Sequence, residues 1–329
     1  MSRDGHPNRK VRRAFEQMQA TNSEAVRLRR AGRDAAALNA AERAVRECEA
    51  LCAMDPIYRS SLITVLLNAA SLARLNEDVL SWLHYAARGM ATAYEIEDST
   101  GRAPAEAERA VTDFEATTFA LSFGRDTDLL RESLTTVRDG TSAERRAAVL
   151  ETVELTLRIG DRHRRAGAAE VAIGHYNAAT VLTEACHTLG PAFVAADCAA
   201  WMSLGEARVM TTEFRPGGRE SASRACSRAL NSLNDFFRTE EVGIIMTLID
   251  ELPAAAELKR RCALAGDMLV RYSGVLDALG HESASIGMEV SGRTLLEPLG
   301  RVERVDLDIR RDMAVEKFNE VELSFTEKP

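Results

Sequence analysis

Aromatic residues, prolines and lysines are scarce in this chain. Of its 329 residues 5% are aromatic, 8 are proline and 4 are lysine, whereas 46% are hydrophobic. Alanine, leucine, arginine and glutamate dominate, which favours helices. An alternation typical of a strand occurs at Val305, Leu307 and Ile309, where a short edge strand or a frayed helix would serve equally well. The composition therefore predicts an all-α protein, and the excess of arginine over lysine is typical of a GC-rich, bacterial genome.

The common catalytic motifs are also missing. The sequence has no glycine-rich phosphate loop, no nucleophile elbow, no histidine pair with an intervening glutamate and no zinc knuckle of paired cysteines. Glu184 and His187 have the Glu-x-x-His spacing of di-iron helical bundles, but the second pair that this chemistry needs is absent. A solvated glutamate and histidine on one helix face explain the spacing better.

Two further polar groups carry little catalytic signal. Asp308 and Asp312 are one helical turn apart, as in the acidic helices of all-α isoprenoid enzymes, and Asn234-Asp235 would have to supply the facing motif. Arg238, however, stands where a small hydroxyl ligand would be needed. The segment from His281 to Ser285 is explained by a helix-cap turn. We therefore predict no catalytic residue, no metal site and no cofactor, and keep an all-α enzyme as a remote alternative.

Charge makes nucleic acid an unfavourable partner. The formal net charge is −8, which argues against a general nucleic-acid binder. The first fifty residues are locally basic, with eleven Arg or Lys against seven Asp or Glu, and the run Arg9 to Arg13 contributes four of these cations. We interpret residues 1–20 as a basic N-terminal arm or first helix.

Cysteine usage and hydropathy favour a cytoplasmic protein. Six cysteines are present, and Cys48, Cys226 and Cys262 lie on predicted apolar helix faces, as expected for small buried hydrophobes in a reducing compartment. Cys48 and Cys52 are one turn apart and could touch a metal, but no second pair completes a site. The N-terminus lacks an apolar signal core, and the uncharged run 60–73 is too short to span a bilayer. No membrane partner is expected.

The stretch from Ile159 to Ala179 is the most informative part of the sequence. Gly160 would let one helix approach another closely, and Ala172, Tyr176 and Ala179 at i, i+4 and i+7 give the following helix one face to pack back. This pattern predicts a helix hairpin. Weaker copies recur upstream and downstream, which favours a repeating unit; their leading residues are Leu28, Gly32, Ala44 and Cys48 in the first, Leu67, Ala70, Leu83 and Ala86 in the second, and Trp201, Gly205, Ala222 and Cys226 in the last.

These residues resemble the tetratricopeptide repeat family, whose units are antiparallel helix pairs with Trp, Leu-Gly and an aromatic in the first helix and Ala, aromatic and Ala in the second. The resemblance covers four units within residues 21–231 and departs from the family pattern at Thr156, Leu67 and Arg208. It implies a right-handed α-solenoid of antiparallel helix hairpins. Residues 232–329 are expected to be a C-terminal helical region of degenerate repeats or capping helices with a loose tail.

A repeat array of this kind has a concave groove lined by the first helix of each pair. Residues just before and after the small glycine position are expected to line it: Arg29, Arg33, Asn68, Ser71, Asp161, Arg164, Arg165, Met202 and Glu206. In tetratricopeptide proteins that capture a C-terminal carboxylate, such positions carry Lys, Arg and Asn. Asn68 and the arginines fit that chemistry and could hold an acidic segment, whereas Asp161 and Glu206 would repel a carboxylate.

Three function classes follow. The leading hypothesis is a non-catalytic adaptor that binds a protein or peptide segment in the groove. The alternative is a regulator that senses a peptide or a small molecule and gates a partner, and the remote alternative is the all-α enzyme. The sequence leaves self-association into a homo-oligomer open, and it does not identify the partner.

Overall fold

Every regular element in the described part of the chain is a helix. The computed structural model describes residues 9–121, 127–211, 217–236 and 255–301. The predicted all-α class is therefore confirmed for these ranges, and the possible strand at Val305 to Ile309 lies outside them. The α-helices are α1 (Arg9–Arg30), α2 (Asp34–Met54), α3 (Arg59–Leu75), α4 (Val79–Thr100), α5 (Ala107–Leu121), α6 (Thr127–Asp139), α7 (Ser142–Arg165), α8 (Ala169–Cys186), α9 (Pro191–Val209), α10 (Gly218–Phe236), α12 (Ala255–Ala278) and α13 (Glu282–Leu296), with short 3-10 turns at Pro56–Tyr58, His187–Leu189 and Glu297–Leu299.

The chain forms two compact units. The first comprises residues 1–156 and 181–193, and the second comprises residues 157–180 and 194–329. Helix α1 begins at Arg9, so residues 9–20 belong to a first helix and not to an arm. The predicted boundary between residues 231 and 232 falls inside α10, which runs without a break to Phe236.

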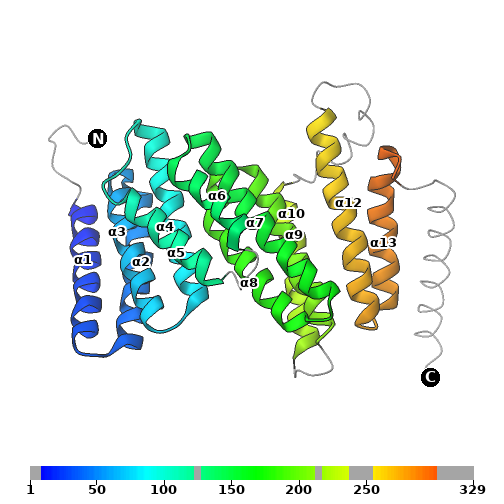
Figure 1. Cartoon of the computed structure of the whole chain (residues 1–329), viewed down its shortest axis with the longest axis horizontal. Coiled ribbons are helices and arrows are strands. Elements are labelled where there is room, and N and C mark those ends of the chain that lie inside the picture. Colours follow the sequence, from blue (N-terminus) through cyan, green and yellow to red (C-terminus); the bar gives the residue numbers. More distant parts are fainter. Residues whose placement is uncertain (1–8, 122–126, 212–216, 237–254, 302–329) are drawn as a thin grey trace. The chain divides into compact units, whose positions relative to one another are not determined.

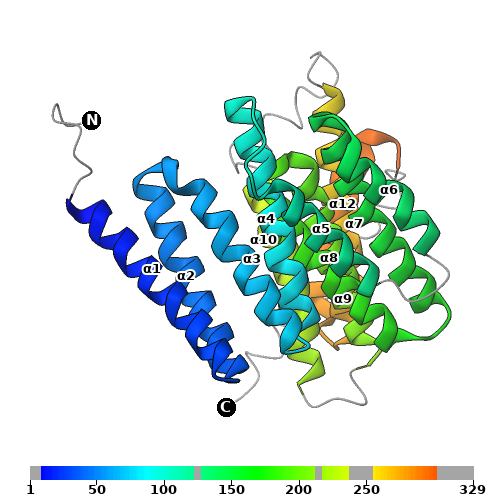
Figure 2. The ribbon, with the colours of Figure 1, turned by 60° about the vertical axis from the view of Figure 1, so that its left-hand side comes forward.

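In the first unit, helices that follow one another in the chain also pack against one another. Helix α2 contacts α1 and α3, and α4 contacts α3 and α5, as the blue and cyan ribbons of Figures 1 and 2 show. The turn between α3 and α4 is formed by Asn76, Glu77 and Asp78: Glu77 adopts a positive φ of 58°, and the Asp78 carboxylate accepts the backbone N–H of Ser81 at 3.1 Å. The chain therefore reverses within three residues, and the two helices form a hairpin.

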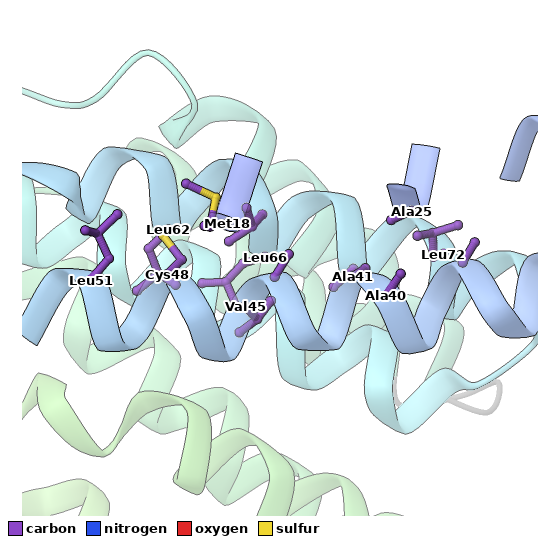
Figure 3. Packing of buried hydrophobic residues seen from close by; sticks show 14 of the residues in the cluster. Met18, Ala25, Ala40, Ala41, Val45, Cys48, Leu51, Leu62, Leu66 and Leu72 are labelled. Carbon is purple, nitrogen blue, oxygen red and sulfur yellow. The ribbon is translucent and has the colours of Figure 1, made fainter. Parts of the chain in front are cut away.

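Small residues allow the helices of this unit to lie close together. Ala37, Ala40, Ala41 and Ala44 of α2 are fully buried, and Met18 of α1 and Leu66 of α3 complete the core between these helices. Figure 3 shows Met18, Ala40, Ala41 and Leu66 in this core, with Cys48 and Leu51 at one end. Gly32 corrects one expectation: it is not a packing glycine of a first helix but a turn residue with φ 69°, and a Cβ there would meet nothing within 4 Å.

The best hairpin signal in the sequence is confirmed in the second unit. A Cβ built at Gly160 on α7 would lie 2.6 Å from Cε1 of Tyr176 on α8, so the ring occupies the space that any larger residue would need. Ala172, Tyr176 and Ala179 are all fully buried, as their spacing predicts. Gly205 makes a similarly close approach to Cys226 of α10.

One close helix contact in the second unit was not predicted by the repeat pattern. Gly266 of α12 and Gly292 of α13 face each other, because a Cβ on Gly292 would lie 2.7 Å from the Gly266 carbonyl oxygen. The two helices form a hairpin closed at Gly280, which has φ 80°. The C-terminal region therefore contains a tightly packed helix pair that lacks the spacing of the earlier repeats.

Two connections in the first unit show how its helices begin and end. Thr141 and Glu144 form a capping box at the start of α7: the Glu144 carboxylate accepts the Thr141 N–H at 2.8 Å, and Thr141 Oγ1 accepts the Glu144 N–H at 3.5 Å. A non-helical connection of residues 101–106 joins α4 to α5. Helix α4 continues to Thr100 and ends at Gly101 in the left-handed region, and α5 begins only at Ala107, beyond Pro104.

Candidate functional site: a polar face on helices α1, α3 and α5

One side of helix α3 lies outside the core of the first unit. Thr64, Asn68, Ser71 and Leu75 are three or four residues apart and therefore share this side of the helix. Leu75 is 47% exposed, and Asn68 and Ser71 are half-buried, whereas Leu66, Leu67 and Ala70 on other sides are buried. Two of the residues predicted for the groove, Asn68 and Ser71, thus lie together on one accessible helix face.

Hydrogen bonds connect this side of α3 to the helices on both flanks. Asn68 Nδ2 donates to Asn22 Oδ1 of α1 at 3.2 Å. Arg109 Nη2 of α5 donates to Ser71 Oγ at 3.3 Å, and Thr64 Oγ1 donates to the Glu106 carboxylate, just before α5, at 3.4 Å. Helices α1, α3 and α5 are the first helices of successive hairpins. These contacts therefore join their polar side chains into one continuous surface. We call it the α1–α3–α5 face, made of Asn22, Thr64, Asn68, Ser71, Glu106 and Arg109.

A half-buried carboxylate lies beside the arginine of this face. Asp113 follows Arg109 by one turn of α5, and its Oδ2 is buried without a hydrogen-bond partner in the described part of the chain. Burial raises the pKa of Asp113 above its ordinary value, and the nearby charges of Arg109 and Arg74 oppose that rise. Arg74 is itself held with its guanidinium carbon 5.5 Å from the centroid of the Trp82 ring.

Arg29 and Arg33 lie at the end of α1 and beyond it. Arg29 is exposed in the last turn, two turns after Asn22 and therefore on nearly the same side of the helix. In that position the cation also interacts favourably with the C-terminal end of the helix dipole. Arg33 belongs to the turn between α1 and α2, so its predicted place on a first helix is wrong.

In the second unit, three residues predicted for the groove form an internal ion network. Arg164 of α7 pairs with Glu206 of α9, and its Nη2 lies 3.5 Å from Asp161 Oδ1. Tyr176 OH donates to the same Asp161 oxygen at 2.6 Å, and burial together with this bond raises the pKa of the Tyr176 phenol. The carboxylates expected to repel an acidic partner are therefore neutralised by the chain itself.

Arg271 of α12 completes this network. Its Nε and Nη2 donate to the two carboxylate oxygens of Glu206 at 2.6 and 2.9 Å, and Nη2 also donates to Ser203 Oγ at 2.9 Å. Sequence reasoning missed Arg271 because it lies 65 residues after Glu206 and outside the repeat pattern. The bidentate bond fixes α12 to α9, so the network holds the second unit together.

Met202 and Arg165 differ from the other predicted groove residues. Met202 is fully buried and packs with Cys226 and Met268, so its prediction as a groove residue is wrong. The spacing around Gly205 predicted that these residues form a helix, but it did not predict that α12 would cover the side of this helix that carries Met202. Arg165 is exposed in the last turn of α7, and within the described ranges no ion pair joins it to the network.

A pocket of 490 Å³ opens in the first unit beside α5. Tyr94 forms one wall, and its OH donates to the Val137 carbonyl at 2.7 Å. Arg145 lies over the Tyr94 ring, 5.6 Å from its centroid, and donates to Glu97 at 2.9 Å. The remaining lining residues are Ala103, Ala107, Glu108, Val111, Thr112, Arg138 and Asp139.

The weaker polar motifs form no metal site in the described ranges. Glu184 and His187 are exposed, and the ring Nδ1 of His187 lies 2.8 Å from the Glu184 carbonyl oxygen. Ser285 Oγ donates to the Ser273 carbonyl at 2.8 Å inside the α12–α13 hairpin. Among the residues with described positions, no group of three or more metal-ligating side chains occurs, and no helix is long and apolar enough to cross a membrane. Asp308 and Asp312 lie outside the described residues.

Comparison with known proteins adds a structural resemblance. No protein-family model and no curated protein matches the sequence. The crystal structure of BtubC (BKLC) from P. vanneervenii resembles 81% of this chain over 92% of its own length, with 13% sequence identity and a TM-score of 0.33. The interpretation of the surfaces described above therefore depends on the residues of this chain alone.

Proposed function

We propose that this protein is a non-catalytic helical-repeat adaptor that binds a protein or peptide segment along the α1–α3–α5 face. The observation that carries the proposal is the pair of interhelix contacts from Asn68 to Asn22 and from Arg109 to Ser71. They place hydrogen-bonding side chains of three first helices side by side at an accessible surface. The resemblance of the repeats to tetratricopeptide units, which bind such segments on first helices, supports the same function.

The asparagine pair is suited to a polypeptide backbone. Its single mutual bond uses one N–H of Asn68 and the carbonyl of Asn22. An asparagine amide has two donors and one acceptor with two lone pairs, so the N–H groups of Asn22 and the carbonyl of Asn68 remain for a ligand. A peptide unit offers one N–H and one C=O, which matches this combination.

Apolar and cationic residues at the border of the face indicate which side chains the bound segment has. Val26 of α1 and Leu75 of α3 are 39% and 47% exposed, and both can contact an apolar side chain. Arg29 and Arg109 add positive charge on the two flanking helices, and guanidinium groups pair with carboxylates in a bidentate manner. The proposed partner is therefore an extended segment with apolar and acidic side chains.

Site-specific photo-crosslinking tests the location of binding. A photoreactive residue at Leu75, on the uncovered side of α3, is compared with the same residue at Ala50, exposed on the second helix α2. Both variants are mixed with lysate of the source cells and irradiated. The proposal predicts a discrete adduct at position 75 and none at position 50, with the crosslinked peptide containing acidic residues. Equal crosslinking at the two positions would refute the assignment of the face.

The pocket beside Tyr94 favours a second candidate, a regulator that senses a small molecule. Its volume of 490 Å³ lies in the range of about 300–1,000 Å³ that is usual for ligand sites. Val111→Trp would fill the pocket, since Val111 lines it. A metabolite that raises the melting temperature of the wild type but not of this variant would support the regulator.

A further inference from the structure

The pocket beside Tyr94 is built from the ends of several helices of the first unit. Tyr94 and Glu97 belong to the last two turns of α4, and Glu108 and Val111 belong to the first two turns of α5. Asp139 is the last residue of α6. Side chains that are far apart in the sequence therefore line one cavity of 490 Å³.

Both arginines of this pocket are already held by carboxylates of the chain. Arg145 Nη1 donates to Glu97 at 2.9 Å, and the same guanidinium lies over the Tyr94 ring. Arg138 Nη2 donates to the carboxylate of Glu115, whose side chain is 10% exposed. Each guanidinium charge is thus compensated by a carboxylate, so the arginines leave no net positive charge for an anionic ligand.

Two further carboxylates of the pocket lack such a partner. Within the described ranges, no ion pair or side-chain hydrogen bond involves the carboxylate of Glu108 or of Asp139, and both residues are exposed. Asp139 ends α6, where a negative charge interacts unfavourably with the C-terminal end of the helix dipole. Four carboxylates face two guanidinium groups in and directly behind the pocket, which leaves a net charge of −2: Glu97, Glu108, Glu115 and Asp139 against Arg138 and Arg145.

The rest of the pocket is mainly apolar. Ala103, Ala107 and Val111 line it, together with the hydroxyl-bearing Thr112. The Tyr94 side chain is buried, and its OH is engaged by the Val137 carbonyl at 2.7 Å. A ligand that fits this lining combines positive charge with an aliphatic body.

We propose that the pocket binds an aliphatic diamine or polyamine, with one ammonium group at Glu108 and another at Asp139. An ammonium group offers three N–H donors, and charge-assisted bonds to carboxylates are stronger than neutral ones. The methylene chain loses contact with water against Val111 and Ala107. This inference rests on the small-molecule regulator given above as the second candidate function and names the class of its ligand. Because the two carboxylates belong to α5 and α6, the bound ligand would join these helices and stabilise the first unit.

Calorimetric titration of the full-length protein tests the ligand class. Putrescine, with an ammonium group at each end, is compared with butylamine, which has one, and with succinate, which has a carboxylate at each end. Putrescine should bind, butylamine should bind more weakly by about three- to tenfold, and succinate should not bind. Added salt should weaken putrescine binding through screening. Absence of putrescine binding, equal affinity for butylamine, or tighter binding of succinate would overturn the proposal.

Three variants locate the binding. Glu108→Gln and Asp139→Asn replace an exposed carboxylate by an amide of similar size, so each should keep the fold and weaken putrescine binding by about three- to tenfold. Glu132→Gln is the matched control, because Glu132 is exposed on α6 and does not line the pocket. Its affinity should equal that of the wild type. The same affinity in all three variants would overturn the proposal.

Val111→Trp distinguishes a failure of this inference from a failure of the regulator. Putrescine should raise the melting temperature of the wild type and not of this variant, since Val111 lines the pocket. An unchanged effect in the variant would place the amine elsewhere and overturn the proposal. A neutral or anionic metabolite that acts through the pocket while putrescine does not would overturn the amine assignment and leave the regulator standing. If no compound acts through the pocket, both fail.

Discussion

The Tyr176 ring of α8 lies in the place that a side chain at Gly160 of α7 would occupy, with Cε1 2.6 Å from the position of a Gly160 Cβ. Gly160→Leu would force the ring out of this position, and such overpacking typically costs about 1–3 kcal/mol. Chemical denaturation should show this loss in the free energy of unfolding. Gly174→Ala on α8 is the matched control, since a Cβ there meets nothing within 4 Å. It should stabilise the helix by about 0.5–1 kcal/mol. Similar behaviour of the two variants would contradict the proposed packing.

Tyr176 stabilises the second unit through both its ring and its hydroxyl. Tyr176→Ala should destabilise by about 3–5 kcal/mol, because the ring is fully buried. Tyr176→Phe retains the ring and removes the 2.6 Å hydrogen bond to Asp161, so a smaller loss of about 1–2 kcal/mol is expected. Denaturation of the two variants in parallel separates the effect of the ring from that of the hydroxyl. A Phe variant as unstable as the Ala variant would mean that the hydroxyl, and not the packing of the ring, accounts for the stabilisation.

The network around Glu206 should behave as one unit. Arg271→Leu leaves Glu206 with Arg164 alone, and the loss should be about 1–3 kcal/mol, below the value for fully buried pairs because the side chains are partly exposed. A double-mutant cycle with Arg164→Leu should give a coupling energy different from zero. Strict additivity of the two single losses would show that the arginines act separately.

Asp113 should make stability depend on pH. Its folded pKa is raised, so the cost of burying the charge is fully present above the folded pKa and disappears as the pH falls below the unfolded value. Asp113→Asn should therefore raise the free energy of unfolding near pH 7. The advantage of the variant should shrink as the pH is lowered through the acidic range above the ordinary value of 3.8. Denaturant titrations at several pH values measure this, and an advantage that grows toward acid would have the wrong sign.

Local packing could be predicted from the sequence more readily than long-range contacts. Gly160, Ala172 and Tyr176 were identified because a helix contact between neighbours leaves a spacing of small residues. Asn68 and Ser71 were placed on an accessible face for the same reason. Met202 was misplaced and Arg271 was missed because their environment depends on α12 docking on α9, more than sixty residues apart in the chain. A contact of this kind does not produce a periodic pattern within one repeat, so the pattern could not predict it.

The charge of the proposed segment can be tested by reversing the arginines of α1. Arg29→Glu with Arg33→Glu should weaken binding and leave the fold intact, because exposed charges contribute little to stability. Arg29 lies on the same side of α1 as Asn22. Arg29→Glu alone should therefore weaken binding more than Arg33→Glu alone. Raising salt should weaken the wild-type complex more than that of the reversed variant, since long-range attraction is screened over about 8 Å at physiological ionic strength. Equal salt dependence of both would indicate that these arginines do not contact the partner.

The affinity of the crosslinked segment for the α1–α3–α5 face is the most direct test of the adaptor function. Once the segment is synthesised as a peptide, its Kd is measured by calorimetry with wild type, with Asn22→Ala plus Asn68→Ala, and with Asn39→Ala, a control exposed on α2. Two lost hydrogen bonds of about 1 kcal/mol each predict a Kd at least tenfold higher for the double variant. The control should bind like wild type. An unchanged Kd in the folded double variant would contradict the proposed binding face.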